Sequence, residues 1–170
     1  MTTAHGQVLE FQNSPITEEE RSSREAIYRP LCWVVNGLRL KHDRQKFIAA
    51  LRLAEVVQTE PLNMLVSTAN CLLLRKWENS GVPVFFDFGE IEEEGDPVRF
   101  GTPVLWASRP GSPRGLALLV PMFRDGFLQG MINNEPLPGI KGVLPLRQVP
   151  NFTAPMSRQP WRGPRRNWRL

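Results

Sequence analysis

The sequence predicts an α+β fold in which N-terminal helices pack on a small, irregular antiparallel β meander. Apolar residues recur every three or four positions over about 44–79, and the period changes to two over about 84–132. Prolines then recur about every five residues from position 145, which excludes a helix there. We therefore expect a flexible arm over 1–14, a single α+β domain over 15–144 and an extended tail over 145–170.

The first predicted element is a short helix from about Glu18 to Tyr28. Thr17 and Glu20 have the spacing of a capping box, and Pro30 follows the last turn. An Asn-Gly pair at 36–37 then divides the apolar run over 31–40. Because Asn-Gly between apolar runs is typical of a two-residue turn, the sequence predicts a short β-hairpin at this point.

Two longer helices are predicted next. Asp43 is placed to cap a helix that continues to about Gln58, and Thr59 is placed to cap a second one with Pro61 in its first turn. The connection between them is only two or three residues long. The two helices should therefore pack antiparallel as an αα-hairpin over about 44–79.

Strands are predicted for the rest of the domain. Val84, Phe86 and Phe88 alternate with their neighbours, and 98–106, 116–120 and 127–132 follow as further strands separated by Gly- and Pro-rich or charged turns. Six acidic residues between positions 87 and 96 surround the first of these turns. We interpret them as a solvated turn, because they lack the spacing of a calcium-binding loop.

The excess positive charge is concentrated at the C-terminus. The chain carries a net charge of +4, from 21 Lys and Arg against 17 Asp and Glu. Residues 157–170 hold five arginines and no acid, which leaves 16 basic and 17 acidic residues in 1–156. A nearly neutral body therefore carries a basic segment at its end.

The basic tail predicts binding to RNA or single-stranded DNA. Arginines pair with phosphates and tryptophans stack on unpaired bases, and the tail alternates the two. Its candidate nucleic-acid-binding residues are Arg158, Trp161, Arg162, Arg165, Arg166, Trp168 and Arg169. This arrangement favours binding without sequence specificity.

A second basic cluster precedes the first of the two longer helices. Its candidate residues are Arg39, Lys41, Arg44 and Lys46. The free N–H groups at the start of a helix favour an anion, so a phosphate is expected to rest there. The alternative is an ordinary charged start of a helix.

The sequence excludes most enzymatic classes that short motifs can reveal. It lacks a phosphate loop, a dinucleotide fingerprint, a nucleophile elbow and metal-ligand spacing of His and Cys, so no cofactor or metal is expected. We expect a non-enzymatic accessory or structural protein, with self-association of the body. Its layout, a compact body with a basic arm, is that of small viral proteins that handle RNA.

An alternative interpretation of the same tail is an anchor for an anionic membrane surface, which would make the protein a peripheral scaffold. The sequence offers no apolar run of the length that crosses a bilayer and no secretory leader at its start. Cys32 and Cys71 lie in apolar runs, which indicates buried thiols in a reducing compartment. We therefore expect an intracellular protein, cytoplasmic or nuclear.

Overall fold

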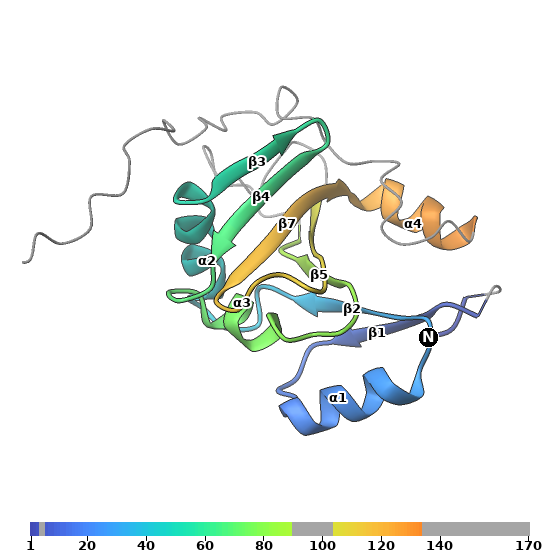
Figure 1. Cartoon of the computed structure of the whole chain (residues 1–170). Helices are drawn as coiled ribbons and strands as arrows, with labels where there is room; N and C mark the ends of the chain where they lie inside the picture. The colour runs from blue at the N-terminus through green and yellow to red at the C-terminus, as the bar shows by residue number, and fades with distance from the viewer. Residues whose placement is uncertain (4–5, 90–103, 134–170) are drawn as a thin grey trace, which may run out of the picture.

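A seven-stranded mixed sheet forms the centre of the protein, with helices packed on both of its faces (Figure 1). The computed structural model describes residues 1–3, 6–89 and 104–133. Across the sheet the strands follow the order β1-β2-β5-β6-β7-β4-β3. The first three run parallel to one another, and every later neighbour is antiparallel.

The elements alternate along the chain. The strands are β1 (Val8–Gln12), β2 (Leu31–Asn36), β3 (Glu55–Thr59), β4 (Leu62–Ser67), β5 (Val84–Asp87), β6 (Val104–Ser108) and β7 (Leu116–Phe123). The helices in the described residues are α1 (Glu18–Ile27), α2 (Asp43–Arg52), α3 (Leu72–Trp77) and α4 (Arg124–Ile132). Helix α1 connects β1 to its parallel neighbour β2, as a parallel pair requires a crossover.

Alternating side chains of the strands divide the core into two layers. Trp33 and Phe86 point to the layer that contains α2 and α3, where Phe47 of α2 packs 5.9 Å from Phe86 between ring centres. Val34 and Phe85, one position away on the same strands, point to the layer that contains α4. Because both faces of the central strands are covered, β2 is an almost continuous apolar run.

The predicted first helix is confirmed. Helix α1 begins at Glu18 and ends at Ile27, and the hydroxyl of Thr17 accepts a hydrogen bond from the backbone N–H of Glu20 at 3.1 Å. The acidic residues of its first turn lie at the positive end of the helix dipole. The capping residues alone were therefore enough to predict this helix correctly.

The predicted fold class is wrong, because the strands form one mixed sheet rather than a meander beneath an αα-hairpin. Within 44–79, α2 ends at Arg52 and the chain then forms the antiparallel pair β3 and β4 before the short helix α3. Buried Leu62, Met64 and Val66 recur every second residue. This period of two belongs to a strand, and the helical spacing noted over the same stretch was coincidental.

Three local predictions are also wrong. Asn36 and Gly37 do not form a hairpin turn, because β2 ends at Asn36 and pairs on both sides with parallel strands. The predicted strand over 127–132 is part of α4, whose Phe127 and Met131 are one turn apart and buried. The predicted arm contains β1, and the amino group of Met1 donates to the carbonyl of Leu9 at 2.8 Å.

The outcome of the remaining predictions differs from one segment to the next. The extended segments over 84–87 and 116–120 are confirmed by β5 and β7, while Asp43 begins α2 rather than capping it through its side chain. The acidic turn beyond Gly89 and the tail over 145–170 lie outside the described residues. Among the helices of the described ranges, none is long and apolar enough to cross a membrane.

Candidate functional site

The carboxyl ends of the three parallel strands meet at one edge of the sheet. Gln12, Asn36 and Asp87 are the last residues of β1, β2 and β5. Because these strands run in the same direction, their terminal polar side chains come together. In sheets with parallel strands, ligands commonly bind outside such carboxyl ends. Cavities lie at this edge of the sheet, lined in part by residues at the ends of β1 and β2.

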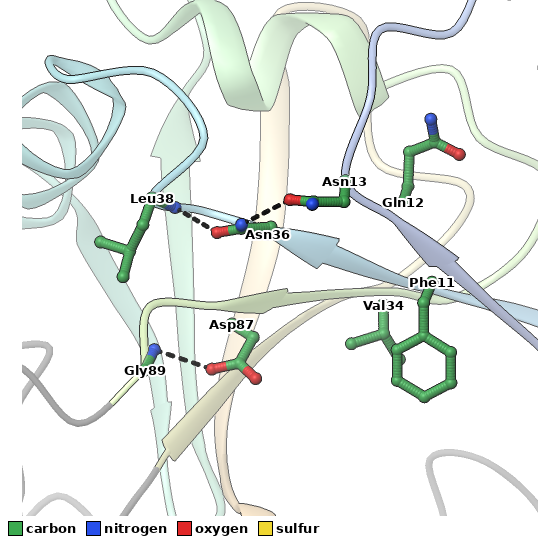
Figure 2. Close-up of a pocket in the computed structure, with 8 residues that line it drawn as sticks. All are labelled: Phe11, Gln12, Asn13, Val34, Asn36, Leu38, Asp87 and Gly89. Atoms are coloured by element: carbon green, nitrogen blue, oxygen red, sulfur yellow. Dashed lines mark hydrogen bonds between the residues drawn. The ribbon is translucent and has the colours of Figure 1, made fainter.

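One cavity at this edge has a volume of about 360 Å³ and is lined by both apolar and polar side chains (Figure 2). We call it the aromatic cavity. Its lining residues are Phe11, Gln12, Asn13, Val34, Asn36, Leu38, Asp87 and Gly89. Phe11 is 63% exposed, although its register partner Val34 on β2 is buried. A large aromatic surface is therefore presented to solvent beside a preformed space.

Hydrogen bonds fix the polar rim of the aromatic cavity. The Asn36 amide donates from Nδ2 to Oδ1 of Asn13 at 2.7 Å and accepts at Oδ1 from the backbone N–H of Leu38 at 2.8 Å (Figure 2). Asp87 Oδ1 accepts from the Gly89 N–H at 2.8 Å and from Arg124 Nη2 at 2.8 Å. Because Arg124 pairs with Asp87, the cavity carries little net charge.

A second cavity, of about 80 Å³, lies on the other side of Gln12 and is lined by two cations. We call it the cationic cavity. Arg39 from the loop after β2 and Lys76 from α3 line it together with Asp43 and Trp77. Gln12 lines both cavities, so the two spaces are neighbours at the same edge of the sheet.

The charged side chains that line the cationic cavity are two cations, Arg39 and Lys76, and one carboxylate, Asp43. Burial, together with the charges of Arg39 and Arg21, lowers the pKa of Lys76. Burial raises the pKa of Asp43, and the charge of Arg39 opposes that rise. Within the described part of the chain, no ion pair joins Arg39 or Lys76 to a carboxylate. An added negative group would therefore relieve the repulsion between these cations.

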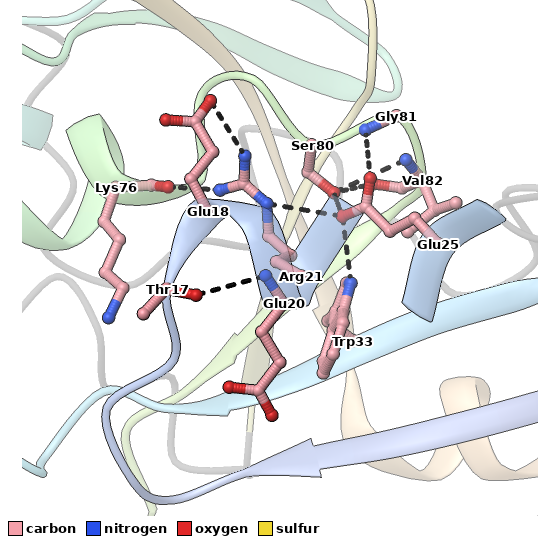
Figure 3. A network of polar contacts seen from close by, with 10 residues as sticks. All are labelled: Thr17, Glu18, Glu20, Arg21, Glu25, Trp33, Lys76, Ser80, Gly81 and Val82. Atoms are coloured by element: carbon pink, nitrogen blue, oxygen red, sulfur yellow. Dashed lines mark hydrogen bonds and ion pairs between the residues drawn. The ribbon is translucent and has the colours of Figure 1, made fainter. Parts of the chain in front are cut away.

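A buried polar network positions helix α3 and its Lys76 (Figure 3). Arg21 of α1 is 2% exposed and donates from Nη1 to the backbone carbonyl of Lys76. Glu25, one turn further along α1, accepts from Trp33 Nε1 at 3.1 Å, from Ser80 Oγ at 2.8 Å and from the backbone N–H of residue 81 at 2.9 Å. The network thus links α1, β2 and the segment after α3.

The structure brings one of the predicted binding residues, Arg39, into the cationic cavity. Lys41 and Lys46 are exposed at the start of α2, whereas Arg44 is only 9% exposed. The remaining candidates lie outside the described residues, namely Arg158, Trp161, Arg162, Arg165, Arg166, Trp168 and Arg169. The cation that lies with Arg39 in the cationic cavity is therefore Lys76 of α3, which was not among the predicted binding residues.

Sequence reasoning missed the residues that the fold adds to this edge. Phe11, Gln12 and Asn13 fall in the segment interpreted as an arm, and Lys76 falls in the predicted αα-hairpin. The signal that was available is the stretch Val8–Gln12, in which buried Leu9 is followed two residues later by Phe11 on the same face. No short-range pattern would have joined Lys76 to Arg39.

The two cysteine thiols, which could be reactive if exposed, are both buried. Cys32 is fully buried, and burial raises the pKa of its thiol to about 12. Cys71 is also fully buried, and burial likewise raises its thiol pKa. In the portion of the chain that the structure describes, no group of three or more His, Cys, Asp or Glu side chains is arranged to hold a metal ion.

Comparison of this chain with protein-family models, with curated proteins and with solved structures finds no match in any of the three. The assignment of a function therefore depends on the site itself.

Proposed function

We propose that this protein is a non-enzymatic accessory or structural protein that binds RNA or single-stranded DNA, with phosphate groups held by Arg39 and Lys76. The observation that carries the proposal is the convergence of these two cations in the cationic cavity. Arg39 offers several N–H donors in a planar fork, and Lys76 adds a compact charge. This pair suits the tetrahedral oxygens of a phosphate.

The basic tail supports the same ligand. Residues 157–170 supply five arginines and two tryptophans without an acid. Arginines bind phosphates and tryptophans stack on unpaired bases, and a single-stranded nucleic acid offers both groups. The cationic cavity would hold one fixed phosphate, and the tail would add attraction that depends on charge and not on sequence.

The test measures the salt dependence of binding to a fluorescent single-stranded oligonucleotide. Loss of one contact to a single-strand phosphate should reduce the slope of log affinity against log salt by about 0.7. We expect this reduction in Arg39→Met and in Lys76→Met. The matched control is Arg52→Met, because Arg52 is exposed at the far end of α2 and lines neither cavity. Equal slopes in all four proteins would contradict the phosphate site.

Deletion of residues 157–170 tests the tail with the same oligonucleotide. The truncated protein should bind more weakly and with a smaller salt slope than the full chain. Vesicles of anionic lipid are measured in parallel, and binding to vesicles but not to the oligonucleotide would favour the membrane-anchor alternative. The oligonucleotide should also keep its full length after incubation with Mg²⁺, and shorter products would contradict a non-enzymatic role.

A further inference from the structure

We propose that the aromatic cavity is a nucleobase subsite in which one unpaired base stacks on Phe11. This inference deepens the proposed function and rests on it. The phosphate contacts of Arg39 and Lys76 require only a polyanion. The aromatic cavity, in contrast, requires a flat, partly apolar group with hydrogen-bonding edges, and an unpaired base has that chemistry.

The apolar walls of the cavity are formed by neighbouring strands. Phe11 and Val34 are register partners on β1 and β2, so their side chains lie next to each other on the same face of the sheet (Figure 2). Leu38, from the loop after β2, also lines the space. A base that enters the cavity would cover the exposed ring of Phe11, and stacking of this kind contributes about 1–3 kcal/mol per base.

The rim of the cavity supplies one donor and one acceptor. Asn13 accepts a bond at Oδ1, and its amide nitrogen donates to none of the described residues. Asp87 accepts the hydrogen bonds of Gly89 and Arg124 at Oδ1, which leaves Oδ2 as an acceptor within the described structure. Base edges carry donors and acceptors side by side, so these two groups are complementary to them.

The aromatic cavity and the cationic cavity are placed so that one continuous nucleic-acid strand could reach both. Gln12 lines both, and each cavity opens at the edge where β1 and β2 end. A single-stranded nucleic acid that crosses this edge of the sheet would place a base against Phe11 on one side of Gln12. It would place a phosphate against Arg39 and Lys76 on the other side. The two contacts can therefore be tested separately by mutation of Phe11 and of Arg39 or Lys76.

The experiment compares an ordinary single-stranded oligodeoxynucleotide with an abasic chain of equal length and charge, using the full-length protein. In Phe11→Ala, affinity for the ordinary oligonucleotide should fall by about fivefold or more, the lower limit for one stacked base. The salt slope and the affinity for the abasic chain should stay unchanged. Phe11→Trp should restore binding, because tryptophan also stacks.

Tyr28→Ala is the matched control, because Tyr28 is an exposed aromatic residue, 42% accessible, that does not line the aromatic cavity. It should bind as the wild type does. Equal affinity of Phe11→Ala and wild type for the ordinary oligonucleotide would overturn the base subsite, even if the salt slopes still support the phosphate site. Absence of binding by wild type to either chain would instead contradict the proposed function. Circular dichroism of each variant separates loss of a contact from loss of folding.

Discussion

Gly37 lies where β2 leaves the sheet and approaches an aromatic ring more closely than any larger residue would allow. A Cβ atom at this position would lie 2.5 Å from Cε1, 2.6 Å from Cδ1 and 2.8 Å from Cζ of Phe88. Phe88 is 1% exposed and packs 4.6 Å from Phe47 between ring centres, so its ring has little space to move. Gly37→Ala should therefore overpack the core.

The expected loss follows from the close contact alone, because the backbone of Gly37 does not have the positive φ that disfavours alanine. Inserting a methylene-sized group into a packed core costs about 1–3 kcal/mol. For a chain of this size, each kcal/mol lowers Tm by about 2–4 °C, so the variant should melt about 2–12 °C below wild type. Binding should also weaken, since Asn36 and Leu38 on either side of Gly37 line the aromatic cavity.

Thermal unfolding followed by far-UV circular dichroism measures this loss. Gly130→Ala is the control, since Gly130 lies in α4 with no atom within 4 Å of an added Cβ. Alanine there should raise the free energy of unfolding by about 0.4–1 kcal/mol through its better helix propensity and smaller unfolded-state entropy. If Gly37→Ala melts at or above the wild-type temperature, the argument from close contact with Phe88 is refuted.

Two further predictions concern buried polar and ionisable groups. Glu25→Ala should lower the free energy of unfolding in urea by about 3 kcal/mol, because it removes a carboxylate partner from buried Arg21 and the acceptor of the Trp33 indole N–H. Glu19→Ala, on the exposed side of α1, should change it little. Burial raises the pKa of the Cys32 thiol from 9.0 to about 12, so the folded state holds this proton more tightly than the unfolded state. The associated stability is complete below about pH 9 and is lost as pH rises toward about 12, which makes urea unfolding at about pH 10.5 easier by about 2 kcal/mol than near neutrality. Over the same pH interval, the free energy of unfolding of Cys32→Ala should fall by about 2 kcal/mol less than that of the wild type. An identical loss in both proteins would contradict the assignment to Cys32.

Local signals predicted the parts of the fold that depend on local contacts. Helix α1 was predicted within one residue because Thr17, the acidic first turn and Pro30 act on neighbouring backbone groups. Strands β5 and β7 were predicted because each is a short apolar run bounded by turn-forming or charged residues. The pairing of β2 with β1 and β5 was not predicted, since it joins segments that are far apart in the sequence.

The candidate site shows the same division. Arg39 was selected from the sequence because it lies in a dense run of basic residues. Its partner Lys76 was not, because only the packing of α3 beside the loop after β2 brings the two together. Phe11 and Gln12 depend on β1 joining the sheet edge in parallel, and a strand next to Asn13, Ser14 and Pro15 resembles a loop in composition. Long-range contacts of this kind leave no short pattern.

Helix α1 is attached to the body in an unusual manner. Of its ten residues only Arg21 is buried, so the helix gains little from the removal of apolar surface from water. Its attachment depends on polar contacts instead. Arg21 and Glu25 make the buried ones, and the more exposed ion pair between Arg24 and Glu10, which dissolved ions screen more readily, joins the helix to β1. Amide protons of α1 should exchange with deuterium earlier than those of β2 beneath it, and faster as ionic strength rises, so this helix should be the first part of the body to open.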